Sequence, residues 1–201
     1  MKSESTLSRG PLQAADLYSL EEYARCRGEF RARVLAHKRD RTAAVGPNMT
    51  WIFEDRLTIQ YQVQEMLRIE RIFEPAGIRE ELETYNPLIP DGSNLKATLL
   101  IEFPEPAERQ LALARMKGVE RRCYMQVAGF ERVLAIADED LERENEAKTS
   151  AVHWIRFEFT PAMRTAMKSG TPVTIGSDHP AYDHSLNLSS TTAVALARDF
   201  G

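Results

Sequence analysis

The stretch from Asn48 to Phe73 constrains the fold more than any other part of the chain. Its first part, from Met49 to Phe53, is short and apolar, and its second part has the composition of a long helix. Apolar side chains recur in this second part at spacings of three and four, as the buried face of a helix requires. They are Ile59, Val63, Met66 and Phe73, with either Ile69 or Glu70 at the position between the last two. The pattern predicts a strand that leads directly into a long helix, with Asp55 as the helix cap.

The same helix carries a second row that is polar. This row contains Gln64, Glu65 and Arg68, and Glu54 lies just before the helix begins. Amides, carboxylates and a guanidinium in register predict one wall of a ligand-binding site. The alternative is a structural network, in which Glu65 pairs with Arg68 along the helix and the glutamine amides bind loop backbone. The sequence leaves both interpretations open.

The rest of the chain places helices first and most strands later. Residues 1–15 are predicted to be a flexible lead-in, and Ser19 with Glu22 forms a capping box that begins a helix ending near Lys38. Apolar patterns predict strands at 96–103, 119–127, 132–137, 151–159 and 172–178, and shorter helices at 78–85, 107–117, 161–168 and 191–199. The acid-rich residues 138–149 are predicted to form an exposed loop. Residues 16–201 are therefore predicted to form a single α+β domain, with a mainly antiparallel sheet, N-terminal helices and interleaved short helices.

Two histidines occupy the apolar faces of predicted strands. His153 alternates with apolar residues in 151–159, and His179 continues the inward phase of 172–178. If these strands pair antiparallel, both imidazoles meet Asp178 at one sheet edge, whereas a parallel crossover would separate them. In the first case Glu65 or Glu54 would complete a site for a divalent transition metal, or a histidine would act as general base. The plainer interpretation is that each imidazole is a hydrogen-bonded core residue.

Charge and composition exclude several classes of function. A formal charge of −4 and a pI near 5.7 argue against a nucleic-acid-binding protein. No run approaches the roughly 20 apolar residues of a membrane span. The N-terminus lacks the apolar core of a secretory signal, and the two cysteines lack the spacing of a metal or redox pair, so we expect a cytoplasmic protein. Nucleotide-binding glycine motifs and the GxSxG and HExxH motifs are absent from the sequence.

Several blocks of the sequence resemble a known bacterial family. They are GPNMTWIFEDRLTIQYQVQEMLRIERI, LETYNPLIPDG, ATLLIEFP, KTSAVHWIRFEFTP and IGSDHPAY. The chain is similar through these blocks, from about Leu20 to Asp199, to the family called domain of unknown function 3501. The family has no assigned activity, and the resemblance carries over no catalytic residue. It implies an association with oxidative-stress or redox metabolism, and with redox or iron–sulfur proteins as partners.

Two functions therefore follow as hypotheses. The first is an accessory or binding protein with a polar pocket for a small ligand, a metal or a partner, built from Glu54, Gln64, Glu65, Arg68 and Asp178. The second is a metal-dependent enzyme, hydrolytic or redox, that uses Glu65, His153 and His179. Neither nucleic acid nor a membrane is expected as a partner, and the sequence leaves a homo-oligomer open.

Overall fold

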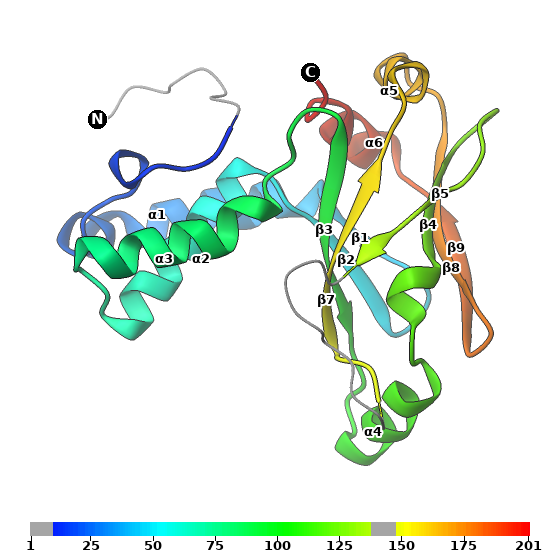
Figure 1. The fold of residues 1–201 in the computed structure, drawn as a ribbon, viewed down its shortest axis with the longest axis horizontal. Coiled ribbons are helices and arrows are strands. Elements are labelled where there is room, and N and C mark those ends of the chain that lie inside the picture. The colour runs from blue at the N-terminus through cyan, green and yellow to red at the C-terminus, as the bar shows by residue number, and fades with distance from the viewer. Residues whose placement is uncertain (1–9, 138–147) are drawn as a thin grey trace.

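The computed structural model describes residues 10–137 and 148–201, and the chain forms two lobes. Figure 1 shows helices side by side in one lobe and the strands gathered in the other. The helical lobe consists of α1 (Leu20–Arg39), α2 (Arg56–Glu70) and α3 (Pro75–Tyr85). Most of the predicted lead-in, and residues 138–147 of the predicted acidic loop, lie outside the described residues.

Two helices of the helical lobe begin where the sequence signals predict. Ser19 caps α1 and forms a capping box with Glu22. Asp55 caps α2, and its carboxylate accepts a bond from the backbone N–H of Thr58 at 3.0 Å. These caps fix the direction in which each helix leaves the preceding segment.

The buried stripe of α2 differs from the predicted one. Ile59, Val63 and Leu67 are buried, whereas Ile69 and Phe73 are 62% and 69% exposed. The helix ends at Glu70, and the following residue adopts a left-handed conformation with φ of 55°, so Phe73 no longer shares the helical face. The buried face of α2 also includes the polar residues Thr58 and Gln64.

The other lobe contains two antiparallel sheets rather than the single sheet that was predicted. Sheet A has the strand order β1-β2-β3-β7-β6, and sheet B has the order β5-β4-β8-β9. Sheet A comprises β1 (Thr42–Ala44), β2 (Met49–Phe53), β3 (Asn94–Ile101), β6 (Ile136–Ala137) and β7 (Val152–Glu158). Sheet B comprises β4 (Cys123–Val127), β5 (Val133–Leu134), β8 (Val173–His179) and β9 (Tyr182–Asn187). The predicted α+β class is confirmed, and the strands and helices form a single domain.

The two sheets are joined at both sides. Ala135 separates β5 from β6, so the segment predicted as one strand crosses from sheet B to sheet A. On the opposite side, the hydroxyl of Tyr182 donates to the carbonyl of Val45 at 2.7 Å and accepts from the N–H of Asn48 at 2.9 Å. One apolar core fills the space between the sheets, and Trp51, Leu99, Phe157, Met125 and Ile175 belong to it.

Short helices cover the ends of this core. Figure 1 shows α5 (Pro161–Lys168) and α6 (Ser190–Ala197) at one end and α4 (Pro106–Arg115) at the other. Met163, Leu196 and Leu113 bring their side chains into the core from these three helices. Three 3₁₀ turns complete the described elements: η1 (Ala14–Asp16), η2 (Asn86–Leu88) and η3 (Val119–Arg122). Within the described residues, no helix combines the length and the apolar character needed to cross a membrane.

Candidate functional site

A cavity of about 700 Å³ lies where the helical lobe meets the outer face of sheet A. The helical lobe contributes the end of α3 and η2, and sheet A contributes β3 and β7. Its lining consists of Glu83, Thr84, Pro87, Leu88, Asp91, Asn94, Lys96, Trp154, Ile155, Arg156 and Glu158. Side chains alternate between the two faces of a strand. Because Leu95, Ala97 and Phe157 point into the core, the residues next to them point outward and supply polar groups to the lining of the cavity.

The aromatic wall of the cavity is the half-buried side chain of Trp154. Its indole meets the ring of Tyr85 from α3 edge-to-face, with centroids 6.1 Å apart and planes at 62°. Trp154 lies directly opposite Thr98 on the neighbouring strand. A contact between the two lobes therefore holds the aromatic wall.

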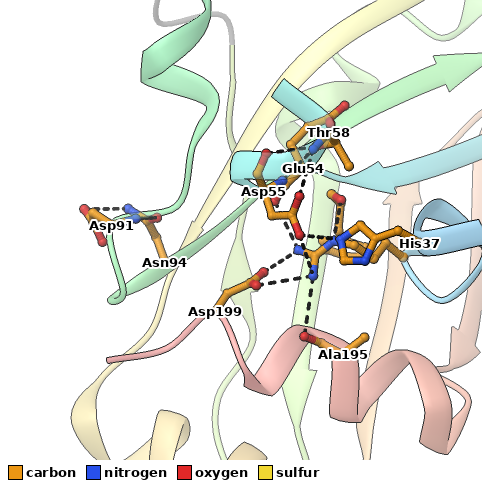
Figure 2. A network of polar contacts seen from close by, with 10 residues as sticks. His37, Glu54, Asp55, Thr58, Asp91, Asn94, Ala195 and Asp199 are labelled. Carbon is orange, nitrogen blue, oxygen red and sulfur yellow. Dashed lines mark hydrogen bonds and ion pairs between the residues drawn. The ribbon is translucent and has the colours of Figure 1, made fainter. Parts of the chain in front are cut away.

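The loop before β3 is fixed by a network of hydrogen bonds. Asp91 accepts from the backbone N–H of Ser93 at 2.8 Å and from its hydroxyl at 2.7 Å. The amide of Asn94 donates to Asp91 at 2.9 Å and to Glu158 at 3.0 Å; Figure 2 shows the Asp91–Asn94 pair. Burial alone would raise the pKa of Asp91, but the bonds from Ser93, the charge of Lys96 and the bond from Asn94 together place the pKa below its usual value. The carboxylate therefore stays ionised, and the wall of the cavity is preformed.

The predicted polar row of α2 faces α1, and not this cavity. Gln64 is fully buried, and its carbonyl oxygen accepts from the backbone N–H of Tyr18 at 2.6 Å. Glu65 accepts from both Nε and Nη2 of Arg27, at 2.8 and 2.9 Å, and from the hydroxyl of Tyr23 at 2.6 Å. Arg68 donates to the same carboxylate at 3.1 Å. The contacts of this row join two helices of the chain.

The charge of Glu65 is a testable part of that junction. The hydrogen bond from Arg27 is the largest cause that lowers its pKa from 4.5 to about 2, with burial opposing and Tyr23 and Arg68 assisting. A carboxyl whose pKa is lower in the folded state stabilises the protein above its unfolded pKa, and this contribution is lost as the pH falls toward the folded value. Glu65→Gln is therefore expected to cost about 1–2 kcal/mol at pH 7. The difference from the wild type should shrink between pH 4.5 and 2.

Urea unfolding of the wild type and Glu65→Gln at pH 7 and pH 3 measures this effect. Glu29→Gln, which removes an exposed glutamate of α1, is the matched control and should change little at either pH. A loss for Glu65→Gln that is the same at both pH values would contradict the assigned role of its charge.

The other two predicted ligand residues lie apart from each other. Glu54 is buried and accepts from the hydroxyl of Thr98 at 2.6 Å, so it lies at the same face of sheet A as the cavity. Asp178 lies on sheet B and pairs with Arg122 at 2.8 Å and with Arg132 at 3.3 Å. The structure therefore does not bring Glu54, Asp178 and the α2 row into one site.

The two predicted metal-binding histidines lie in different sheets. The strand of His153 pairs with β3 and β6, and the strand of His179 pairs with β4 and β9, so the two strands are not neighbours in either direction. His153 is fully buried, and its Nε2 lies 2.9 Å from the hydroxyl of Thr149 and 3.8 Å from the carboxylate of Glu120. His179 bonds the carbonyl of Lys117 at 3.1 Å.

Glu65 is separate from both histidines, because its oxygens are bonded within the helical lobe. Over residues 10–137 and 148–201, no three or more His, Cys, Asp and Glu side chains are grouped to hold a metal ion. The residues present therefore do not fit the metal centre that the sequence suggested.

A second network, around Arg41, was missed at the sequence level. The guanidinium is only 2% exposed and donates to the carbonyls of Phe53 at 2.9 Å and Glu54 at 3.1 Å. It also binds both carboxylate oxygens of Asp199 and lies 3.6 Å from Asp55. Nothing in the run of basic residues at the end of α1 distinguishes Arg41 from its exposed neighbours.

Three elements converge on this network, as Figure 2 shows for His37, Asp55 and Asp199. His37 Nε2 lies 2.5 Å from the carboxylate of Asp55. Burial alone would raise the pKa of Asp55, but the bond with His37 and the charge of Arg41 lower it below the usual value. Burial raises the pKa of Asp199, and the neighbouring charge of Arg41 offsets only part of this rise. The network fastens the segment after α6 to the junction of β2 and α2.

Comparisons with known proteins place the chain in a family. The model of the family described as "Protein of unknown function (DUF3501)" matches residues 11–200. The chain is also similar to a solved structure described as a novel protein of unknown function from Burkholderia pseudomallei, with 48% identity and a TM-score of 0.91. That match covers 94% of this chain and 99% of the other. A search of the curated proteins found no match. The chain therefore belongs to the DUF3501 family of proteins of unknown function.

Proposed function

We propose that the chain is a small-molecule-binding protein whose site is the cavity between the helical lobe and sheet A. The observation that carries the proposal is a half-buried tryptophan in a cavity of about 700 Å³. Ligand sites typically measure about 300–1,000 Å³ and combine an aromatic or apolar wall with a few placed polar groups. Trp154, Leu88 and Pro87 supply the apolar part here, and Asn94, Lys96 and Arg156 supply polar groups.

The rigidity of the lining supports the same function. Lys96 and Trp154 stand on β3 and β7, which pair with each other inside sheet A. The facing loop is tied to β3, because the ammonium of Lys96 donates to the carbonyls of Pro87 at 2.6 Å and Ile89 at 2.9 Å. A wall that is ordered before binding avoids the entropy cost of ordering side chains and loops around the ligand.

The neutral fluorescent probe N-phenyl-1-naphthylamine tests the proposal. Its rings fit against an indole face, so Trp154→Ala is expected to weaken its binding at least about tenfold, measured by fluorescence titration. Phe73→Ala removes a more exposed aromatic side chain elsewhere and is the matched control, with an expected change of less than about twofold. The fully buried Trp51 serves as an internal reporter that each variant is folded. Equal affinity of the wild type and Trp154→Ala would contradict the proposal.

The two remaining sequence predictions stay separate from this one. A redox or iron–sulfur protein partner is a prediction from the family resemblance, and a pull-down with the untagged protein as competitor tests it. A metal-dependent activity stays a prediction from the sequence alone, because the structure does not bring Glu65, His153 and His179 together, and elemental analysis of untagged protein tests it.

A further inference from the structure

We infer that the ligand of this cavity is a flat aromatic molecule without a net charge, and this inference rests on the proposed function. Its basis is the way in which the charged side chains of the lining compensate one another. Five of the lining residues are charged: Glu83, Asp91, Lys96, Arg156 and Glu158. Arg156 forms an ion pair with Glu158, and the positive charge of Lys96 acts on the carboxylate of Asp91. Four of the five charges therefore already have an opposite charge of the protein beside them.

A charged ligand gains little from such a lining. It has to give up its water shell on entering the cavity, and this cost is offset only where an opposite charge is available. Arg156 would have to leave Glu158 to bind an anion, and Glu158 would have to leave Arg156 to bind a cation. The exposed Glu83 is screened by water, so its attraction for a cation is weak. Ligands of either sign are therefore disfavoured against an uncharged molecule of the same shape.

The hydrogen-bonding groups of the lining are also used within the protein. The amide nitrogen of Asn94 donates to Asp91 and Glu158, and its carbonyl oxygen accepts from the backbone N–H of Asp91 at 3.2 Å. The hydroxyl of Thr84 donates to the carbonyl of Glu80 at 2.9 Å. A polar ligand loses its hydrogen bonds to water on binding and finds few replacements here, whereas an apolar ligand has none to lose.

Apolar surface reaches the cavity from both lobes. Pro87 and Leu88 belong to η2, and Trp154 stands on β7. The ammonium of Lys96 donates to the carbonyl of Pro87 at 2.6 Å, which fixes η2 relative to the sheet. An aromatic ring that packs against an indole gains about 0.5–1.5 kcal/mol beyond the area that it buries. The lining therefore favours a flat aromatic ring among uncharged ligands.

Displacement of the neutral probe N-phenyl-1-naphthylamine tests the ligand class with three competitors that share one ring system. They are methyl 2-naphthoate, which is uncharged, 2-naphthoate, which is an anion, and 2-naphthylmethylamine, which is a cation at pH 7. The ester is expected to displace the probe from the wild type at a concentration at least about tenfold lower than either ion.

Two variants show whether the paired charges cause this preference. Glu158→Gln leaves Arg156 without its carboxylate, so displacement by 2-naphthoate should improve at least about fivefold while displacement by the ester stays the same. Arg156→Met leaves Glu158 without its cation, so displacement by 2-naphthylmethylamine should improve by a similar factor. The matched controls Glu29→Gln and Arg31→Met remove exposed charges of α1 and should change neither.

Each outcome decides between the two claims. If either ion displaces the probe as well as the ester does and Trp154→Ala still weakens the probe, the ligand class is wrong and the proposed function stands. If Glu158→Gln and Arg156→Met keep the preference of the wild type unchanged, the paired charges do not set it and the inference is overturned. If the probe binds independently of Trp154, the proposed function fails and this inference fails with it. Because Glu158→Gln keeps an acceptor for Asn94, it decides the question where Arg156→Met does not fold.

Discussion

Arg41→Ala is expected to lower the free energy of unfolding by about 3–5 kcal/mol, because it leaves the half-buried carboxylates of Asp199 and Asp55 without their buried cation. Arg41 is 2% exposed and binds Asp199 through two nitrogens. Its removal also takes away the hydrogen bonds that Arg41 donates to the carbonyl oxygens of Phe53 and Glu54. Urea unfolding followed by circular dichroism measures the loss.

Arg39→Ala is the matched control for this prediction. Arg39 lies two residues earlier, at the exposed end of α1, and surface substitutions of this kind change stability by less than about 0.5 kcal/mol. Asp199→Asn should destabilise less than Arg41→Ala, because Asn keeps an acceptor for the guanidinium. Equal stabilities of Arg41→Ala and Arg39→Ala would show that the network does not fasten the chain.

The second large effect is expected from Gly176→Ala, which should cost about 2–3 kcal/mol. Gly176 lies in β8 between β4 and β9, and a Cβ there would lie 2.6 Å from the backbone oxygen of His184 and 2.9 Å from the hydroxyl of Tyr124. Backbone in a paired strand cannot withdraw without disturbing the ladder. Thermal unfolding of the variant measures the cost.

Gly28→Ala is the matched control, and its effect on the stability of the protein should have the opposite sign. Gly28 lies on the exposed side of α1, and a Cβ there meets nothing within 4 Å. The same substitution should therefore stabilise the protein by about 0.5–1 kcal/mol through helix propensity alone. If Gly176→Ala is as stable as the wild type, the close approach of β8 and β9 is not a constraint on this position.

The Arg41 network also bears on the candidate ligand site. Asp199 is followed two residues later by Gly201, whose backbone N–H donates to the carbonyl of Gly92 at 3.0 Å. Gly92 adjoins Asp91 in the lining of the cavity. The C-terminal segment therefore contacts both the junction of the two lobes and the loop that forms one wall of the cavity.

Local signals in the sequence predicted many of the elements, although residues 119–122, which were expected to begin a strand, form the 3₁₀ turn η3. The capping residues Ser19 and Asp55 and the apolar run of Met49 to Phe53 each act within a few residues, so they can be recognised without knowledge of the fold. The division into two sheets could not be recognised in this way. It depends on Ala135, where the chain crosses between sheets, and nothing in the run 132–137 marks a break in the strand.

The candidate site was harder to predict, because it depends on how elements distant in sequence meet. The polar row of α2 looks the same whether it faces a ligand or α1, and only the packing of the helices decides that Glu65 binds Arg27. One signal for the cavity was present. Since His153, Ile155 and Phe157 alternate inward, Trp154 and Arg156 had to point outward, and an outward tryptophan beside a cation is typical of a binding surface.

The most direct test of the ligand site is a crystal structure of the protein with N-phenyl-1-naphthylamine. We expect the naphthalene ring to pack against Trp154 in the cavity between the helical lobe and sheet A. Probe bound elsewhere, for example in the depression beside Met167 and Phe200 between α5 and α6, with the Trp154 cavity empty, would contradict the proposed function.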